Sequence, residues 1–173
     1  MTLDTLHAMP DDDAIRGSVL AQQPDALMRF LELYGTLWSH GELPQSVKEV
    51  ARLRNARTTD CAYCRNVRFA GARDEGLTEG RVALIADGFE DATDLDAREK
   101  AAIRFTDTFL REPSALGDAQ RAELLGLFTP GELVELATGV ALFMGFSKIA
   151  VALGPPPEMD TLVVPTPDWP PTA

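Results

Sequence analysis

The sequence predicts an all-α protein, and three observations lead to that prediction. Apolar residues recur at steps of three and four through most of the chain, which is the period of an amphipathic helix. Helix-capping residues precede several of these stretches. No segment shows the alternation of apolar and polar residues that marks a half-buried strand. We expect one all-α domain over residues 1–154 and a proline-rich tail over residues 155–173.

Composition narrows the class of protein. Of 173 residues, 45% are hydrophobic and 25% are charged, as in ordinary globular proteins. The formal net charge of −11 argues against nucleic-acid binding, which needs a basic surface. No basic segment followed by an apolar run begins the chain, so we expect a cytoplasmic protein. The most apolar stretch, residues 140–153, is interrupted by Ser147 and Lys148 and is shorter than the roughly 20 residues of a spanning helix, so no membrane role is expected.

The first half of the chain contains three expected helices before the cysteines. Acidic residues 11–13 precede a short helix, because negative charge favours a helix N-terminus. After Pro24, Asp25 can cap a second helix that ends near Gly41. Pro44 lies in the first turn of a third helix, which runs through Ala56.

The cysteines are expected at the start of the next helix. Thr58, Thr59 and Asp60 are all good N-cap residues. A helix beginning there would carry Cys61 and Cys64 in its first turn and would end near Gly76.

Four further helices follow in the second half. Thr78 can cap a helix through residue 85, and the acidic run over residues 87–96 is expected to be a loop. Asp96 opens an amphipathic helix that stops near residue 113, and a short helix follows from Asp118. Thr129, Pro130 and Glu132 have the spacing of a capping box with proline in the first turn, which predicts a helix to residue 154.

Two features of the C-terminal part predict contacts with other chains. Residues 140–153 are apolar on nearly all sides of their helix, so they need cover from several directions, and we expect a homo-oligomer. Seven of the twelve prolines lie in residues 155–173, so the tail is neither a helix nor a central strand. Two interpretations of the tail stay open: it is disordered, or it lies along a partner through apolar anchors, namely Leu162, Val163, Val164 and Trp169.

The two cysteines lie in a basic part of an acidic chain. Seven lysines and arginines occur over residues 48–73, against only Glu49 and Asp60. A thiolate is the nucleophile in disulfide exchange and peroxide reduction, and nearby cations lower the thiol pKa. On the predicted helix, Arg65 and Arg68 would each lie one turn beyond a cysteine. The pattern favours a redox-active dithiol at Cys61 and Cys64.

Other interpretations of the cysteines are weaker. A zinc site needs four ligands, but there is no second cysteine pair and the only histidines are His7 and His40, so no metal is expected. Two buried and inert thiols remain an alternative.

Three more residues are candidates for the site. Glu49 either forms a salt bridge with a nearby arginine or acts as general base for a cysteine. Tyr63, between the cysteines, either packs in the core or hydrogen-bonds to the site. His40 is expected mainly in a loop role, although it could approach the cysteines.

The segment from Glu49 to Cys64 resembles the E-x11-C-x2-C motif of the alkylhydroperoxidase D-like, carboxymuconolactone decarboxylase superfamily. Residues 70–78 and 145–150 are also similar to parts of that family. The resemblance implies an all-α helical bundle with the CxxC at a helix N-terminus, assembled as a dimer, trimer or hexamer.

The resemblance also implies roles for individual residues. Cys64 would attack the peroxide, Cys61 would resolve the intermediate, and Glu49 would belong to a proton relay. The family's histidine, four residues after the second cysteine, is replaced by Arg68. Arginine cannot accept a proton, although Arg68 could hold a thiolate or an anionic substrate.

These observations predict a thiol-dependent oxidoreductase. It would reduce a small-molecule peroxide or exchange with a partner's disulfide, would be re-reduced by a dithiol, and would need no cofactor other than the Cys61–Cys64 disulfide. Two alternatives are a carboxymuconolactone decarboxylase-like enzyme that binds an organic acid through the basic segment, and a non-catalytic oligomeric binding protein. The resemblance disfavours the first, because decarboxylase members usually lack the paired cysteines.

Overall fold

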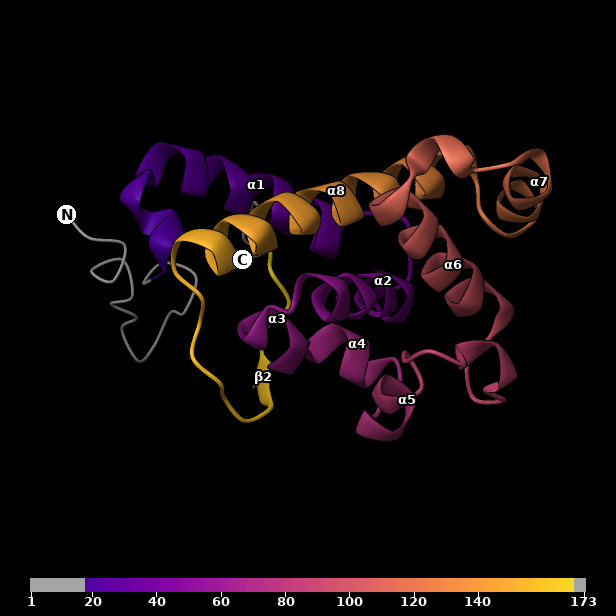
Figure 1. The fold of residues 1–173 in the computed structure, drawn as a ribbon, viewed down its shortest axis with the longest axis horizontal. Helices are drawn as coiled ribbons and strands as arrows, with labels where there is room; N and C mark the ends of the chain where they lie inside the picture. Colours follow the sequence, from indigo (N-terminus) through magenta and orange to yellow (C-terminus); the bar gives the residue numbers. More distant parts are fainter. Residues whose placement is uncertain (1–17, 170–173) are drawn as a thin grey trace.

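The computed structural model describes residues 18–169 and confirms the all-α prediction. Helix α2 (Gln45–Thr59) lies at the centre and packs most extensively on α6 (Ala97–Arg111) and α8 (Pro130–Leu153). Helix α1 (Pro24–His40) packs on α8, which runs along the length of the molecule (Figure 1). The helix expected after residues 11–13 begins outside the described residues, and only a 3-10 turn, η2 (Val19–Gln22), is seen near it.

The predicted start signals mark the helices they were expected to mark. Capping boxes open α6 at Asp96 and α8 at Thr129, and Thr78 caps α5 (Glu79–Ala83). Helix α7 (Asp118–Leu127) follows a short 3-10 turn, η4 (Pro113–Ala115). The acidic run is a loop apart from η3 (Phe89–Asp91).

The prediction of one long helix that carries both cysteines and ends near Gly76 is wrong. Helix α2 continues through Thr59, and Asp60 then takes a left-handed conformation with φ of 53°. A short helix, α3 (Ala62–Asn66), is followed by the strand β1 (Val67–Phe69) and a second short helix, α4 (Ala70–Asp74). The helix breaks because residues 67–69 are extended and pair with another strand, with all three residues buried.

The partner strand is in the tail, where no strand was expected. Strand β2 (Leu162–Val164) runs parallel to β1, with Val67 opposite Leu162 (Figure 1). Three-residue strands are too short to show an alternating pattern in a sequence. The tail is also held by Thr166 Oγ1, which accepts from Gly71 N at 2.9 Å. Up to residue 169 the tail therefore lies along its own chain.

Helix α8 combines a buried face with an exposed apolar face. By length and composition it could cross a membrane, a test that core helices also pass. Leu136, Val140 and Phe143 are buried, whereas Val134 and Ile149 are exposed. The exposed face agrees with the expectation of an oligomer, which stays a prediction.

An aromatic cluster between α1, β1 and α8 forms the part of the core nearest the cysteines. Tyr34 is in edge contact with Trp38 and Phe143, with ring centroids 5.0 and 4.8 Å away. Phe30 stacks on Phe146 at 3.9 Å. This cluster sets the apolar surroundings of the candidate site.

Candidate functional site

The two cysteines are brought together by the turn between α2 and α3. The left-handed Asp60 reverses the chain direction, and Cys61 is the N-cap residue of α3. The Cys61 sulfur accepts a hydrogen bond from Cys64 N at 3.3 Å. Both thiols are free; Cys61 is buried and Cys64 is half-buried. The expectation that the pair lies at a helix start is met, but Cys61 itself caps the helix rather than the three residues before it.

Ser147 is a site residue that sequence reasoning missed. It lies on α8, is buried, and its hydroxyl oxygen is 3.4 Å from the Cys64 sulfur. The sequence did indicate such a role. Ser147 is a polar residue within the most apolar helix of the chain, where a buried hydroxyl needs a hydrogen-bond partner.

Arg52 is the second missed residue, and it connects α2 to the cysteine segment. Its guanidinium donates to both carboxylate oxygens of Glu49, at 2.6 and 2.7 Å. It also donates to the backbone oxygens of Cys64 at 2.7 Å and of Val67 at 2.6 Å. The guanidinium carbon lies 4.9 Å from the centre of the Phe69 ring, a cation–π arrangement. The sign in the sequence was an acid and an arginine three residues apart on one helix.

The surroundings separate the pKa values of the two thiols. The hydrogen bond with Cys61 lowers the pKa of Cys64; burial opposes this, and the Ser147 hydroxyl and the Arg52 charge assist it, so that the pKa is about 7. The same thiol–thiol hydrogen bond, together with burial, raises the pKa of Cys61 well above its usual range. Cys64 is therefore the more readily ionised of the two thiols near neutral pH.

A small apolar cavity lies beside Cys64. Its volume is about 60 Å³, enough for a few water molecules or a small ligand. Both cysteines, Tyr63, Arg52 and Ser147 line it, together with aromatic residues from α1, β1 and α8: Phe30, Tyr34, Phe69, Phe143 and Phe146. Cys64 thus faces a cavity lined mainly by aromatic side chains.

The predicted site residues divide into two groups. Cys61, Cys64 and Tyr63 line the cavity. Glu49 is fully buried on the far side of Arg52 from Cys64 and forms the salt bridge that was one of its two expected roles. It also accepts a hydrogen bond from Phe69 N at 3.4 Å.

Arg68 and His40 are not among the residues that line the cavity. Arg68 was expected one turn beyond Cys64 on the same helical face, and this placement is wrong because the chain is extended at β1. Its side chain is buried against Glu79, with Nη2 3.1 Å from Oε2, and lines a different hollow. His40 Nε2 lies 2.8 Å from Asp168 Oδ1, so it holds the tail against α1.

Among residues 18–169, no group of three or more His, Cys, Asp or Glu side chains is placed to hold a metal ion.

The geometry defines a class: an all-α protein with a CxxC pair at the start of a short helix, beside an aromatic cavity. Residues 24–108 match the carboxymuconolactone decarboxylase family. This match bears out the resemblance to the alkylhydroperoxidase D-like, carboxymuconolactone decarboxylase superfamily that the sequence shows.

The sequence also has relatives among proteins of Mycobacterium tuberculosis. Uncharacterised proteins from two strains of Mycobacterium tuberculosis are each 33% identical to the chain over 106 residues. The match covers 61% of this chain and 37% of each relative, so the chain corresponds to little more than a third of their length.

Two solved structures share the fold. A protein of unknown function from Agrobacterium tumefaciens, suggested to be the antioxidant defence protein AhpD, gives a TM-score of 0.66 at 20% identity, over 80% of this chain and 95% of its own. A cysteine-to-alanine variant of the debrominase Bmp8, in complex with 2,3,4-tribromopyrrole, gives 0.64 at 17% identity, over 78% of this chain and 72% of its own.

Proposed function

We propose that the protein is a thiol-dependent oxidoreductase that reduces a small peroxide through Cys64 and Cys61. One observation carries the proposal: Cys64, whose thiol pKa is lowered to about 7, lines an apolar cavity next to a second thiol whose pKa is raised. A nucleophilic thiolate and a resolving thiol are the two groups that peroxide reduction needs. The small cavity suits a small peroxide better than a protein disulfide.

The reaction proceeds in two steps on the chain's own residues. The Cys64 thiolate attacks the peroxide oxygen, the O–O bond breaks, and Cys64 becomes a sulfenic acid. The departing alkoxide or hydroxide takes up from solvent the proton that Cys64 released on ionisation, and leaves as alcohol or water. The Cys61 sulfur then attacks the Cys64 sulfur, the S–O bond breaks, and the hydroxyl leaves as water with the Cys61 proton. A dithiol reductant returns the disulfide to two thiols.

In this scheme Arg52 and Ser147 stabilise the Cys64 thiolate. Arg52 supplies positive charge and Ser147 a hydroxyl donor, and both lower the pKa of Cys64. Glu49 is a positioning residue, because it holds Arg52 from the side opposite Cys64. Arg68 and His40 have no role in this reaction scheme.

Reductive dehalogenation of a small aromatic ring is a second candidate. The aromatic lining of the cavity favours it, and a fold relative is a debrominase bound to a bromopyrrole. Cys64 would take the halogen from the ring, the ring carbon would gain a proton, and Cys61 would then displace halide to give the same disulfide.

The organic-acid alternative loses its main support. A pocket that combines Arg68, Glu49 and aromatic side chains, with the cysteines buried away from it, would favour this alternative. Arg68 instead lines a hollow without aromatic side chains, and the aromatic cavity is lined by both cysteines. The peroxide experiment below distinguishes the oxidoreductase from the non-catalytic alternative, because a binding protein would keep its thiols reduced under peroxide.

The test is to treat the reduced protein with hydrogen peroxide and, separately, with a bromopyrrole. In the first reaction we expect an intramolecular Cys61–Cys64 disulfide that dithiothreitol reverses, measured by mass spectrometry. Cys61→Ser should stop at a Cys64 sulfenic acid that dimedone traps, and Cys64→Ser should give neither product. Cysteines that stay reduced in the folded protein under peroxide would refute peroxide reduction, and bromide release in the second reaction would then favour dehalogenation.

The reductant, the subunit number and the cytoplasmic location stay predictions. Gel filtration with light scattering tests the homo-oligomer directly.

A further inference from the structure

A second hollow lies on the other side of β1 from the cysteine cavity. Its volume is about 520 Å³, much larger than that of the cavity. The lining residues come from α2, α3, β1, α5 and the tail: Leu53, Arg57, Arg65, Asn66, Arg68, Val82 and Glu158. None of them lines the cysteine cavity, so the hollow is a separate site.

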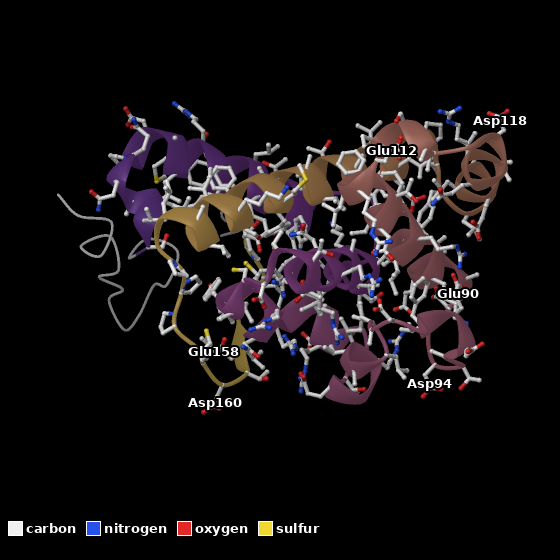
Figure 2. The ribbon with its side chains drawn as sticks, in the orientation of Figure 1. Glu90, Asp94, Glu112, Asp118, Glu158 and Asp160 are labelled. Atoms are coloured by element: carbon white, nitrogen blue, oxygen red, sulfur yellow. The ribbon has the colours of Figure 1, made fainter. Side chains whose placement is uncertain are left out.

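The lining of the hollow is basic in an otherwise acidic protein. Three arginines from three different elements meet there, against one carboxylate, whereas the whole chain carries a net charge of −11. Figure 2 shows that carboxylate, Glu158, on the tail loop beside α3. Since most of the surface repels anions, this concentration of cations is a local exception.

Arg57 is the arginine with unused binding capacity. It is exposed, and its one hydrogen bond to the described residues runs from Nη2 to Val82 O, at 3.1 Å. Within residues 18–169 no carboxylate pairs with it, and burial and the charges of Arg54 and Arg68 lower its pKa. A guanidinium has five N–H donors in a planar fork that fits carboxylate and phosphate oxygens, so Arg57 can accept such a ligand.

The ion pairs already present in the hollow are easily exchanged. Arg65 contacts Asp60 at 2.8 Å and Glu158 at 3.2 Å, and the side chains of these two acids are 80% and 82% exposed. Exposed pairs of this kind contribute little free energy, so an incoming anion can displace Glu158. Arg68, by contrast, is fixed by Glu79 and by the backbone oxygens of Arg65 and Val67, so its charge is already paired and Arg57 and Arg65 are the arginines open to a ligand.

The rest of the lining is mixed. The amide of Asn66 contributes polar atoms, and Leu53 and Val82, both buried core residues, form the floor of the hollow. The groups of the lining that a ligand can reach are therefore mainly polar and basic.

We propose that this hollow is a binding site for a small carboxylate or phosphate anion, whose oxygens are held by Arg57 and Arg65. The proposal is independent of the thiol chemistry.

The test is calorimetric titration of the reduced full chain with succinate and with phenyl phosphate, at ionic strength kept constant with sodium chloride. We expect saturable binding of at least one probe, and the stronger of the two identifies the anionic group. Arg57→Gln should weaken that binding at least tenfold, and Glu158→Gln should strengthen it severalfold because a competing carboxylate is removed. Cys64→Ser should bind like the natural protein.

Arg121→Gln is the matched control, because Arg121 is an exposed arginine on α7, at the opposite end of the molecule from α3 (Figure 1). It should leave binding unchanged. Arg57 is exposed, so its variant is expected to fold, which circular dichroism checks. Absence of saturable binding by both probes, or equal losses in the Arg57 and Arg121 variants, would overturn the proposal.

Discussion

Both carboxylate oxygens of Glu49 accept hydrogen bonds from Arg52, at 2.6 and 2.7 Å, and neither side chain is open to solvent. The remaining Arg52 hydrogen bonds go to the backbone oxygens of Cys64 and Val67. Glu49, the acidic residue of the motif, thus binds Arg52, and Arg52 in turn binds the backbone oxygen of Cys64. Removing either partner would leave the other charge buried and unpaired.

Glu49→Gln is therefore expected to lower the free energy of unfolding by about 3–5 kcal/mol, the usual cost of breaking a buried ion pair. Urea denaturation measures the change. The double variant Glu49→Gln with Arg52→Met should lose less than the two single variants together, because no charge is then left unpaired. A loss below about 1 kcal/mol for Glu49→Gln would contradict a structural role for the pair.

The pH dependence of alkylation should separate the two cysteines. Cys64 becomes a thiolate as the pH rises through its pKa of about 7, so its reaction with iodoacetamide should increase between acidic and mildly alkaline pH with a midpoint there. Cys61 should stay unmodified over that range, because its pKa is raised. Peptide mapping of the modified protein distinguishes the two. A Cys64 midpoint near 8.5, the ordinary thiol value, would show that the surroundings do not activate it.

Ser147→Ala removes a hydroxyl that lowers the pKa of Cys64. The alkylation midpoint should move to higher pH, and the rate at pH 7 should fall by roughly threefold to tenfold, in line with one hydrogen bond to a charged group. Ser114→Ala is a control, because Ser114 is exposed in η4 and contacts only Glu112 in the described chain. Equal midpoints in the Ser147 variant and the natural protein would remove Ser147 from the site.

Arg68→His restores the residue type of the family motif, yet it should not increase peroxide turnover. The Arg68 side chain points into the hollow on the other side of β1, so an imidazole there could not exchange protons with Cys64. The variant should instead be less stable by about 1–3 kcal/mol, since the backbone oxygens of Arg65 and Val67 lose a donor. Peroxide consumption and urea denaturation report the two effects. A gain in turnover would show that residue 68 reaches the cavity.

Gly35→Ala should loosen the end of the tail. A Cβ atom on Gly35 would lie 2.5 Å from Trp169 N, and backbone cannot move aside as a flexible side chain can. We expect a loss of about 1–3 kcal/mol and faster proteolysis within residues 155–169. In Gly126→Ala, also on a helix, the new Cβ would meet no atom within 4 Å of it, so that variant should be as stable as the natural protein or more so.

The sequence was sufficient for the helices whose ends are determined locally. The capping boxes at Asp96 and Thr129 and the proline at residue 24 act within one turn of the chain, so their effect can be predicted from neighbouring residues. The CxxC pair was identified for the same reason, because its spacing alone places two thiols on one turn.

The placement of Arg68 could not be predicted, because it depends on a contact between distant segments. Val67 to Phe69 read as the continuation of a helix, and only the pairing with Leu162 to Val164 makes them extended. In an extended segment neighbouring side chains point to opposite sides, so Arg68 turns away from the side on which Val67 and Phe69 line the cavity. Ser147 was out of reach for a similar reason, since its distance to Cys64 depends on how α8 packs.

The pairing of β1 with β2 also sets the order in which the protein can be completed. A chain made from its N-terminus finishes every helix from α1 to α8 before Leu162 leaves the ribosome, so until then β1 has no strand to pair with. Long-range pairing of this kind forms slowly, after the local helices. The part of the cavity wall that β1 supplies is therefore fixed last, after Arg52 on α2 and Ser147 on α8 have already been made.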